Sequence, residues 1–298
     1  MDSRLLRYFL AVYDSDSISA AADRLRISQP AITRSIRQLE AHLGVELFER
    51  KPNGMVSNKY ADVLARRARL MESEYLNALA EISACRGGSD GIIRIGAGPV
   101  WYSHILPNIV CQFLQEWPGV RIRVTGGVLD TLLPAIDAGK LDLVCANLDF
   151  PRKTGFKTEA ILDIRHVVIA GANHPEAGKS SSTPEVLSKS PWVVLADDEV
   201  GSARIWSFFA AHGCKPPRIA AESTAPELLY RMVSCGPYLA HVPELLLDDA
   251  HGHEIVKLNI PTPFWDSPAG LLYREDSHQP LALKKFIQKV HSAAAGGL

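Results

Sequence analysis

The chain has 298 residues, a formal net charge of −1 and 47% hydrophobic residues. This length and composition are typical of a globular protein with two or three folded units. A net charge so close to zero excludes a general attraction to nucleic acid, so any basic surface must be local.

No apolar run reaches eighteen residues and no signal peptide is recognisable, so we expect a cytoplasmic protein without membrane contact. The cysteines are scattered and odd in number, and none forms a C-x-x-C pair; they are Cys85, Cys111, Cys145, Cys214 and Cys235. This pattern indicates reduced thiols rather than a disulfide framework or a zinc site. We expect no metal and no cofactor. The cysteines are expected to pack in the core, and the alternative is that one of them senses the redox state.

Three helices are predicted before residue 44. Residues 3–14 form the first and bury Leu5, Leu6, Phe9 and Val12. Ser17 can cap a short helix over residues 18–25, and a turn at residues 26–27 follows. Ser28 can cap the next helix. Pro30 fits the first turn of that helix, because a backbone N–H at that position would have no partner within the helix. Short helix, turn and capped helix together indicate a helix-turn-helix.

The third helix has two different faces. Ile32, Ile36, Leu39 and Leu43 follow a 4-3-4 spacing, which predicts a narrow stripe buried in the core. The other side carries Gln, Thr and two Arg side chains. Arg can bind guanine or phosphate, Gln can pair with adenine, and the Thr methyl can contact thymine. A solvated surface helix is the alternative interpretation.

A hairpin-like wing is predicted after Gly44, with its turn at residues 52–54. Basic and amide side chains there can reach phosphate or the minor groove, although a solvated loop explains Lys51 and Asn53 equally well. Serine hydroxyls near the helix starts suit phosphate oxygens. The candidate DNA contacts are Ser17, Ser19, Ser28, Gln29, Pro30, Thr33, Arg34, Arg37, Arg50, Lys51 and Asn53.

This region resembles the N-terminal winged helix-turn-helix of LysR-type transcriptional regulators. The matching residues are 5–9, 17–22, Leu25, 27–33, Ile36, 39–40 and 43–50. The chain departs from the family pattern at residues 57–61, where Ser-Asn-Lys-Tyr-Ala replaces Leu-Thr-x-Ala-Gly. Asn58 can still cap the next helix, so the departure concerns sequence preference rather than fold.

A long helix is predicted over about residues 59–86, with apolar residues in a 4-3 alternation. Such a stripe needs a partner, and we expect the same helix of a second subunit; packing on its own chain is the alternative. The candidate dimerisation residues are Leu64, Ala68, Met71, Tyr75, Ala78 and Ile82. Gly-rich residues 87–91 then form a hinge.

From Gly91 strands and helices alternate, which indicates an α/β fold with a mainly parallel sheet. Predicted strands cover 92–97, 120–124, 141–146, 166–170, 192–195, 218–222 and 271–274. Predicted helices cover 105–116, 129–138, 227–234 and 281–293. Residues 91–96, 106–107, 117–120, 139–143 and 236–243 resemble the effector domain of LysR-type regulators, which is similar to periplasmic binding proteins.

The resemblance implies a mixed fold class: an all-α winged helix-turn-helix head and a long linker helix, followed by a two-lobed α/β effector domain. We expect the head at residues 1–58, the dimerisation helix and hinge at 59–88, and the effector domain at 89–298. Its first lobe would take about 89–163 and 268–298 and its second about 164–267. The lobes would be joined by crossover strands near residues 162–164 and 264–269.

Ligands of open α/β sheets lie at the carboxyl ends of strands, where helices begin. The loops expected there give the candidate effector contacts Pro99, Val100, Trp101, Ser103, His104, Gly126, Gly127, Asn147, Ser202, Ser223 and Thr224. Trp101 with neighbouring polar groups suits an aromatic, carboxylate or sugar-like molecule. Closing the core of the first lobe is the alternative role for Trp101.

The sequence therefore predicts a DNA-binding transcriptional regulator controlled by a small-molecule effector. Its expected partners are double-stranded DNA, the effector and one or three further copies of the chain, with RNA polymerase as a further candidate. The alternatives are an effector-independent repressor and an enzyme of the α/β class. No G-x-S-x-G, H-E-x-x-H or P-loop pattern supports the enzyme. An exported solute-binding protein would need a signal sequence. The pair His251 and His253 is interpreted as a surface turn rather than a metal site.

Overall fold

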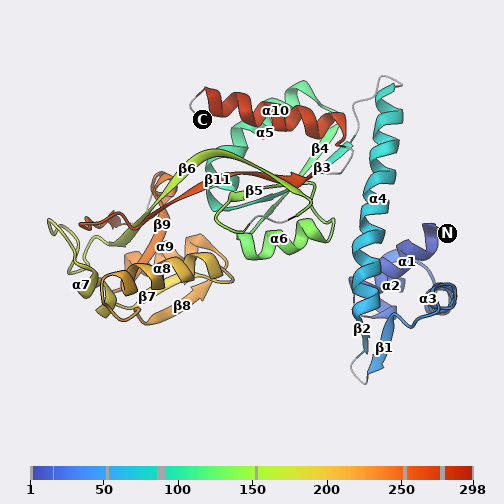
Figure 1. Cartoon of the computed structure of the whole chain (residues 1–298), viewed down its shortest axis with the longest axis horizontal. Helices are drawn as coiled ribbons and strands as arrows, with labels where there is room; N and C mark the ends of the chain where they lie inside the picture. Colours follow the sequence, from blue (N-terminus) through green and yellow to red (C-terminus); the bar gives the residue numbers. More distant parts are fainter. Residues whose placement is uncertain are drawn as a thin grey trace. The chain divides into compact units, whose positions relative to one another are not determined.

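The computed structural model describes residues 3–15, 17–51, 54–85, 91–151, 154–250, 254–275 and 279–296. The chain divides into two compact units, one made chiefly of residues 1–82 and the other chiefly of residues 83–298. Figure 1 shows the elements of both. Among the described residues, no helix combines the length and apolar character needed to cross a membrane.

The first unit is a helical head with a small hairpin. It contains α1 (Ser3–Tyr13), α2 (Ile18–Leu25) and α3 (Gln29–Leu43), then β1 (Phe48–Lys51) and β2 (Gly54–Ser57), which pair antiparallel. Phe9 and Val12 of α1 and Ile32 and Leu39 of α3 are fully buried in one core. Leu43 was predicted to join this stripe but is 39% exposed, because α3 ends there at the left-handed Gly44.

The long helix α4 (Lys59–Cys85) follows the hairpin. Asn58 caps it, and its side-chain oxygen accepts the backbone N–H groups of Tyr60 and Ala61 at 3.0 and 3.1 Å. The first turns of α4 complete the core of the head through Ala61, Ala65 and Ala68.

The described residues of the second unit form one sheet of nine strands in the order β4-β3-β5-β11-β6-β9-β7-β8, with β10 paired to β6. The strands are β3 (Gly91–Ala97), β4 (Val120–Gly126), β5 (Leu143–Asn147), β6 (Phe156–Gly171), β7 (Trp192–Leu195), β8 (Ile219–Ser223), β9 (Leu239–Pro243), β10 (Ile255–Lys257) and β11 (Trp265–Arg274). Strands β3, β4 and β5 are parallel to one another, as are β7, β8 and β9.

The two long strands β6 and β11 pair antiparallel and join the two lobes (Figure 1). The sequence predicted short crossovers and separate strands at residues 166–170 and 271–274. The structure corrects this, because each crossover and the adjacent lobe strand form one continuous strand. The sheet is thus parallel within each lobe and antiparallel where β6 and β11 lie.

Helices cover both faces of each lobe. In the first lobe, α5 (Leu106–Glu116) and α10 (Leu281–Ala295) pack on one face and α6 (Leu129–Asp137) on the other (Figure 1). In the second, α7 (Pro184–Lys189) and α8 (Glu199–Ala211) share one core and α9 (Pro226–Cys235) contributes to another. A π-helical turn (Trp101–Ile105) precedes α5, and a 3-10 segment (Glu244–Ala250) follows β9. The sequence did not predict α7, α8, β10 or this 3-10 segment.

Candidate DNA-binding surface and effector pocket

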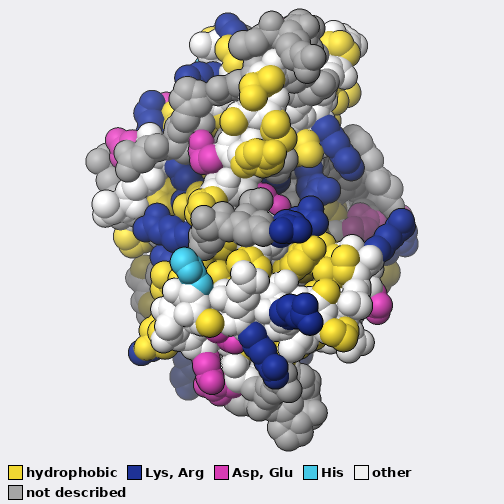
Figure 2. Space-filling model, turned by 90° about the vertical axis from the view of Figure 1, so that its right-hand side faces the viewer, with side chains coloured by type: hydrophobic (Ala, Val, Ile, Leu, Met, Phe, Trp, Pro, Cys, Tyr) yellow, Lys and Arg dark blue, Asp and Glu magenta, His cyan; other side chains and the backbone are white. Residues whose placement is uncertain are grey.

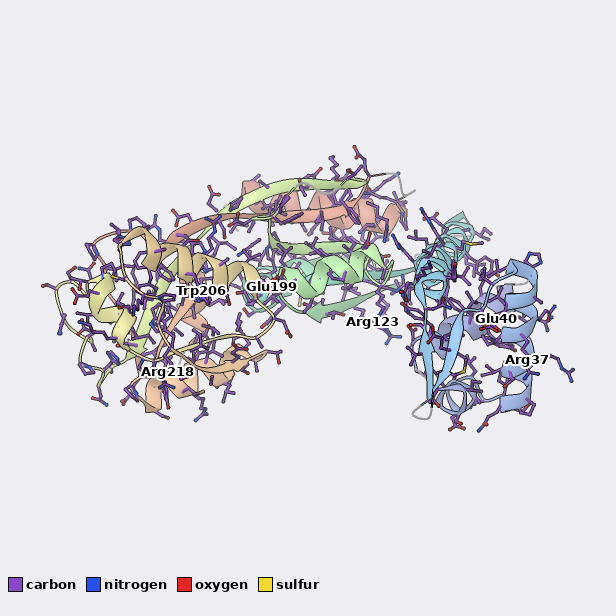
Figure 3. All side chains as sticks on the ribbon, turned by 60° about the horizontal axis from the view of Figure 1, so that its bottom comes forward. Arg37, Glu40, Arg123, Glu199, Trp206 and Arg218 are labelled. Carbon is purple, nitrogen blue, oxygen red and sulfur yellow. The ribbon has the colours of Figure 1, made fainter. Side chains whose placement is uncertain are left out.

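The exposed side of α3 gathers the polar residues that the sequence predicted to contact DNA. Gln29, Pro30, Thr33, Arg34 and Arg37 line one shallow hollow on the helix surface. Arg34 and Arg37 are exposed, and Arg37 projects away from the ribbon (Figure 3). Because Ile32, Ile36 and Leu39 bury the opposite side, the helix cannot rotate these residues inward without losing its core.

Three local features hold α3 in place. Arg26 has a left-handed backbone (φ 55°), which ends α2 and makes the sharp turn that the helix-turn-helix needs. At the far end, the Gly44 N–H donates to the Glu40 carbonyl at 2.8 Å. The Glu40 carboxylate also accepts the Leu47 N–H at 2.8 Å, which directs the chain into the wing.

The predicted phosphate contacts have different surroundings. The Ser17 hydroxyl accepts the Ala20 N–H at 3.4 Å and caps α2. Ser28 lies at the cap position of α3, yet its side chain makes no capping hydrogen bond, contrary to the sequence prediction. Ser19 is exposed. The side chains of Arg50 and Lys51, and all of Asn53, lie outside the described residues.

Figure 2 shows more Lys and Arg side chains than Asp and Glu side chains in the view that it draws. In the helix-turn-helix itself, Arg24, Arg26, Arg34 and Arg37 are all exposed. Arg24 lies 3.8 Å from a carboxylate oxygen of Asp14. The local basic surface predicted from a nearly neutral chain is therefore present.

The predicted dimerisation stripe of α4 divides into two parts. Ala68 is only 2% exposed and Leu64 packs partly against the same core, so both contact their own head, which is the alternative that the sequence left open for this stripe. Met71, Tyr75 and Ile82 are 53%, 65% and 57% exposed, and Ala78 is exposed as well. Leu79, which the sequence analysis omitted, adds to this exposed stripe.

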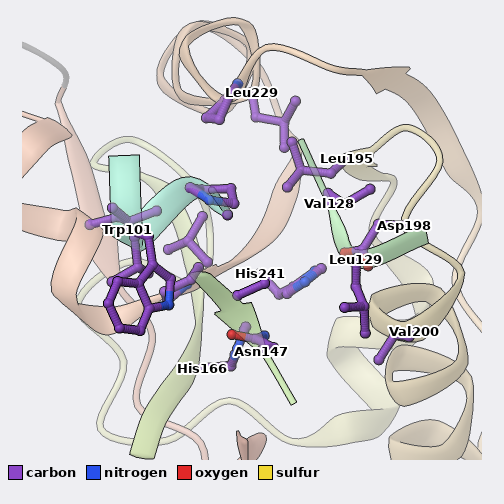
Figure 4. Close-up of a pocket in the computed structure, with 18 of the residues that line it drawn as sticks. Trp101, Val128, Leu129, Asn147, His166, Leu195, Asp198, Val200, Leu229 and His241 are labelled. Atoms are coloured by element: carbon purple, nitrogen blue, oxygen red, sulfur yellow. The ribbon is translucent and has the colours of Figure 1, made fainter. Parts of the chain in front are cut away.

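A cavity of about 80 Å³ lies between the two lobes of the effector domain (Figure 4). The carboxyl ends of β3 and β5 line it through Gly98 and Asn147, and β6 and β9 through His166 and His241. Trp101 forms part of its wall and, at 1% exposure, also belongs to the core of the first lobe. A wider groove of about 730 Å³ shares Pro99, Val128 and Leu195 with the cavity.

Three buried polar atoms of residues at the cavity have no hydrogen-bond partner among the residues that the structure describes: Trp101 Nε1, His166 Nδ1 and His241 Nδ1. The two imidazole rings lie 5.8 Å apart, and each also lies within 5 Å of the Trp265 ring. Burial lowers the pKa of His166 to about 3, with His241 adding a smaller repulsion, and burial lowers the pKa of His241 to about 4. Both rings are therefore neutral at physiological pH.

The predicted effector contacts are only partly brought together. Pro99, Val100, Trp101 and Asn147 line the inner cavity, while Gly126, Gly127 and Thr224 line the outer groove with Pro99. The other predicted contacts, Ser103, His104, Ser202 and Ser223, line neither. Ser103 donates to the Pro99 carbonyl at 2.7 Å, and the Ser223 hydroxyl accepts the Ala225 N–H at 3.0 Å. His104 lines a different hollow, beside Asp163 and Arg165, and Ser202 lies in the first turn of α8.

Sequence analysis missed His166 and His241, whereas Asp198 lies in the loop 197–202, which the sequence had placed among the loops that follow strands. Asp198 caps α8, and its carboxylate accepts the Gly201 N–H at 3.0 Å. Burial raises its pKa against the effect of that hydrogen bond, and the nearby Asp130 adds to the rise. A polar His within an apolar strand, as in residues 166–170 and 239–243, was the one available signal for the histidines.

Two family models match the chain. The model for the bacterial regulatory helix-turn-helix protein of the LysR family matches residues 3–61, and the LysR substrate binding domain matches residues 86–295. The second match alone covers more than half of the chain. The chain belongs to the LysR family of transcriptional regulators.

Relatives of this LysR-family chain match it over its full length or over part of it. The transcriptional regulator PcaQ of Agrobacterium fabrum is 30% identical over 296 residues, which is 98% of this chain and 94% of PcaQ. ClcR of Pseudomonas putida is 36% identical over 144 residues, 48% of this chain and 49% of ClcR.

Solved structures of LysR-family regulators share the fold. The structure of full-length CbnR complexed with its target DNA has a TM-score of 0.70 at 23% identity and covers 98% of this chain and all of CbnR. Full-length BenM has a TM-score of 0.59 at 22% identity and covers 100% of this chain and 98% of BenM. The predicted fold class is confirmed.

This LysR-type protein is thus a DNA-binding transcriptional regulator with an effector-binding domain, as the sequence predicted. The relatives above carry the names of transcriptional regulators, and the enzyme alternative is set aside on that ground.

Proposed function

We propose that the exposed face of α3 enters the major groove and that Gln29, Thr33, Arg34 and Arg37 read base edges there. The proposal rests on the hollow that these residues line on the surface of α3. The buried apolar side of α3 fixes the orientation of the helix. Ser17, Ser19 and Ser28 would contact phosphates, and Arg50, Lys51 and Asn53 would act from the wing. On this view the functional parts are the head at 1–58, the dimerisation helix and hinge at 59–88 and the effector domain at 89–298.

Two subunits would be held together by the exposed stripe of Met71, Tyr75, Ala78, Leu79 and Ile82 on α4, placing two heads on one operator. A tetramer would pair two such dimers. The effector would bind in the cavity between the lobes and change the equilibrium between two arrangements of the lobes, and thereby of the heads. Contact with RNA polymerase would then turn the rearrangement into a change in transcription.

DNA affinity of single variants tests this assignment. The operator probe is the sequence that the full-length protein enriches from a random duplex pool. Arg34→Ala or Arg37→Ala should weaken binding by about 1–3 kcal/mol if the residue reads a base. If the arginine only contacts a phosphate, its replacement by alanine should reduce the slope of log affinity against log salt concentration by about one counterion.

Arg123→Ala is the matched control, because Arg123 is an exposed arginine on β4 of the effector domain (Figure 3). It should leave affinity and salt dependence unchanged. Unchanged affinity and unchanged salt dependence in both α3 variants would refute the assignment of α3 as the reading helix.

A further inference from the structure

The wall of the inner cavity lacks a cationic side chain. Among the described residues that line it there is neither Lys nor Arg. Apart from Tyr230, its ionisable side chains are His166, His241 and Asp198. A carboxylate or phosphate group entering the cavity would therefore find no positive partner and would lie near the acidic Asp198.

The two histidines do not supply the missing charge. His166 is 6% and His241 7% exposed, and neither ring has a carboxylate among the contacts identified above. Ser267 is a distant partner of the His166 ring, with its oxygen 3.5 Å from Nε2, and Trp265 stacks beside it. Charging either ring would place an uncompensated cation in a dry site next to a second imidazole. Both histidines thus serve as neutral hydrogen-bonding groups.

Backbone N–H groups at the N-termini of α8 and α9, the two helices that the second lobe places at the cleft, already have acceptors within the chain. At the start of α8, the Asp198 carboxylate accepts the Gly201 N–H and the Asp130 carboxylate accepts the Glu199 N–H at 2.9 Å. Helix α9 begins with Pro226, which has no N–H, and the preceding Ala225 N–H donates to Ser223. The positive ends of these helices, which commonly bind anions, are neutralised by the protein's own acceptors.

The cavity does offer neutral hydrogen bonds. Trp101 Nε1–H is a donor without a partner, and the free Nδ1 of each histidine can donate or accept according to its tautomer. Asn147 adds an amide at the end of β5 (Figure 4). The remaining wall is apolar, with Val128, Leu129 and Leu229 among its members. A ligand that satisfied the buried nitrogen atoms would remove an energetic penalty of the empty cavity.

The cavity volume limits the ligand to a small molecule. A cavity of about 150 Å³ holds one benzene molecule, and this cavity has about 80 Å³. A ring-sized ligand would fill it after a small separation of the lobes, or would extend into the outer groove past Val128 and Leu195.

We infer that the effector is an uncharged, compact and mainly apolar molecule carrying hydroxyl, carbonyl or amide groups, and that carboxylates and other anions are excluded. The inference rests on the proposed function in one respect, namely that the cavity between the lobes is the effector site. Of the aromatic, carboxylate and sugar-like effectors that the sequence suggested, the inference excludes the carboxylates.

Isosteric probes that differ in charge test the inference. Benzamide and benzyl alcohol are neutral, and benzoate has nearly the same shape with a negative charge. Binding of each to the full-length protein is measured by calorimetry at pH 7.5 and up to 10 mM. We expect at least one neutral probe to bind ten-fold or more tightly than benzoate.

A variant tests the physical cause. Val128 is half-buried in the loop before α6 and lines both hollows, so Val128→Lys places a cation at the cavity. This variant should reverse the order and prefer benzoate, whereas the matched Val128→Met should keep the wild-type order. If Val128→Lys does not fold, the affinities of the wild type for the neutral probes and for benzoate still decide the inference.

Benzoate binding to the wild type as tightly as the neutral probes would overturn the inference and leave the proposed effector site standing. A loss of the wild-type preference in Val128→Met would also contradict it, because no charge has changed. If none of the three proteins bound any probe at 10 mM, the inference and the proposed effector site would both fail, while the DNA-binding assignment would still rest on the arginine variants.

Discussion

The Asp130 carboxylate, at the start of α6 in the first lobe, accepts the backbone N–H of Glu199, at the start of α8 in the second lobe, at 2.9 Å. A second link lies nearby, where Arg204 of α8 pairs with Asp149 after β5. Val200 packs against the core of the first lobe. The N-terminal half of α8 therefore links the second lobe to the first, in addition to Leu246, which is buried in the core of the first lobe.

Asp130→Ala should shift the lobes towards a more open arrangement. The lost hydrogen bond has one charged partner and is partly exposed, so we expect a change of about 1–2 kcal/mol in the closing equilibrium. The exposed thiols Cys111 in α5 and Cys235 in α9 provide one labelling site on each lobe. In a parent protein with Cys85 and Cys214 replaced by Ser, spin labels are attached to these two thiols. Asp130→Ala should then increase the mean distance between the labels or broaden its distribution.

Glu185→Ala is the control for this measurement, because Glu185 pairs with Lys189 inside α7 and does not link the lobes. A label distance that is the same in Asp130→Ala, Glu185→Ala and the parent would show that the hydrogen bond does not hold the cleft.

Two caps that look alike in the sequence should behave differently. Asn58→Ala removes two capping hydrogen bonds from α4 and should lower the free energy of unfolding of the head by about 1 kcal/mol. Ser28→Ala removes no capping hydrogen bond, so it should leave stability nearly unchanged but weaken DNA binding by losing a phosphate contact. Urea unfolding and operator titration of both variants check this; a Ser28 variant that loses stability and keeps its DNA affinity would contradict it.

Met71→Asp should halve the oligomer mass measured by light scattering. Met71 is 53% exposed in the single chain, and an aspartate within an apolar interface would be buried without a partner. Arg66→Asp is the control, since Arg66 is exposed and five residues away on a helix of 3.6 residues per turn, which places it on the opposite side. Equal masses for parent and Met71→Asp would rule out the stripe as the dimer interface.

The histidine pair should make the effector domain sensitive to mild acid. Burial holds the pKa of His166 at about 3 and that of His241 at about 4, below the ordinary value of 6.5 that applies in the unfolded chain. The unfolded chain therefore takes up protons below pH 6.5 that the folded chain does not. The contribution of the two neutral histidines to the free energy of unfolding is fully present above pH 6.5 and is lost as the pH falls towards 4.

The double variant His166→Gln/His241→Gln should lose less stability than the parent between pH 7 and pH 5, by on the order of 1–2 kcal/mol for each histidine. Carboxylates titrate mainly below this window, so it isolates the histidines. Urea unfolding at both pH values measures the difference, and His104→Gln, which removes an exposed histidine, is the control. Identical losses in the parent and the double variant would contradict the neutral state of the pair.

Local patterns were sufficient for the head and for most of the effector strands. The 4-3 spacing of Ile32, Ile36 and Leu39 determined which face of α3 is buried, and so which face shows Arg34 and Arg37. Such patterns predict orientation when a helix or strand packs against a single core, because the spacing of its apolar residues then shows which side is buried.

The cavity between the lobes was decided only by the tertiary structure. His166 and His241 lie 75 positions apart and meet because β6 and β9 pair antiparallel, with His241 opposite Val168. Likewise, Ala68 and Met71 look alike in the heptad pattern, yet only the packed head shows that the first is already buried. The sequence by itself determined most of the elements and which face of α3 is exposed. The neutral state of the histidines at the cavity depends on burial by distant segments, because desolvation is a property of the assembled surroundings and not of the residue.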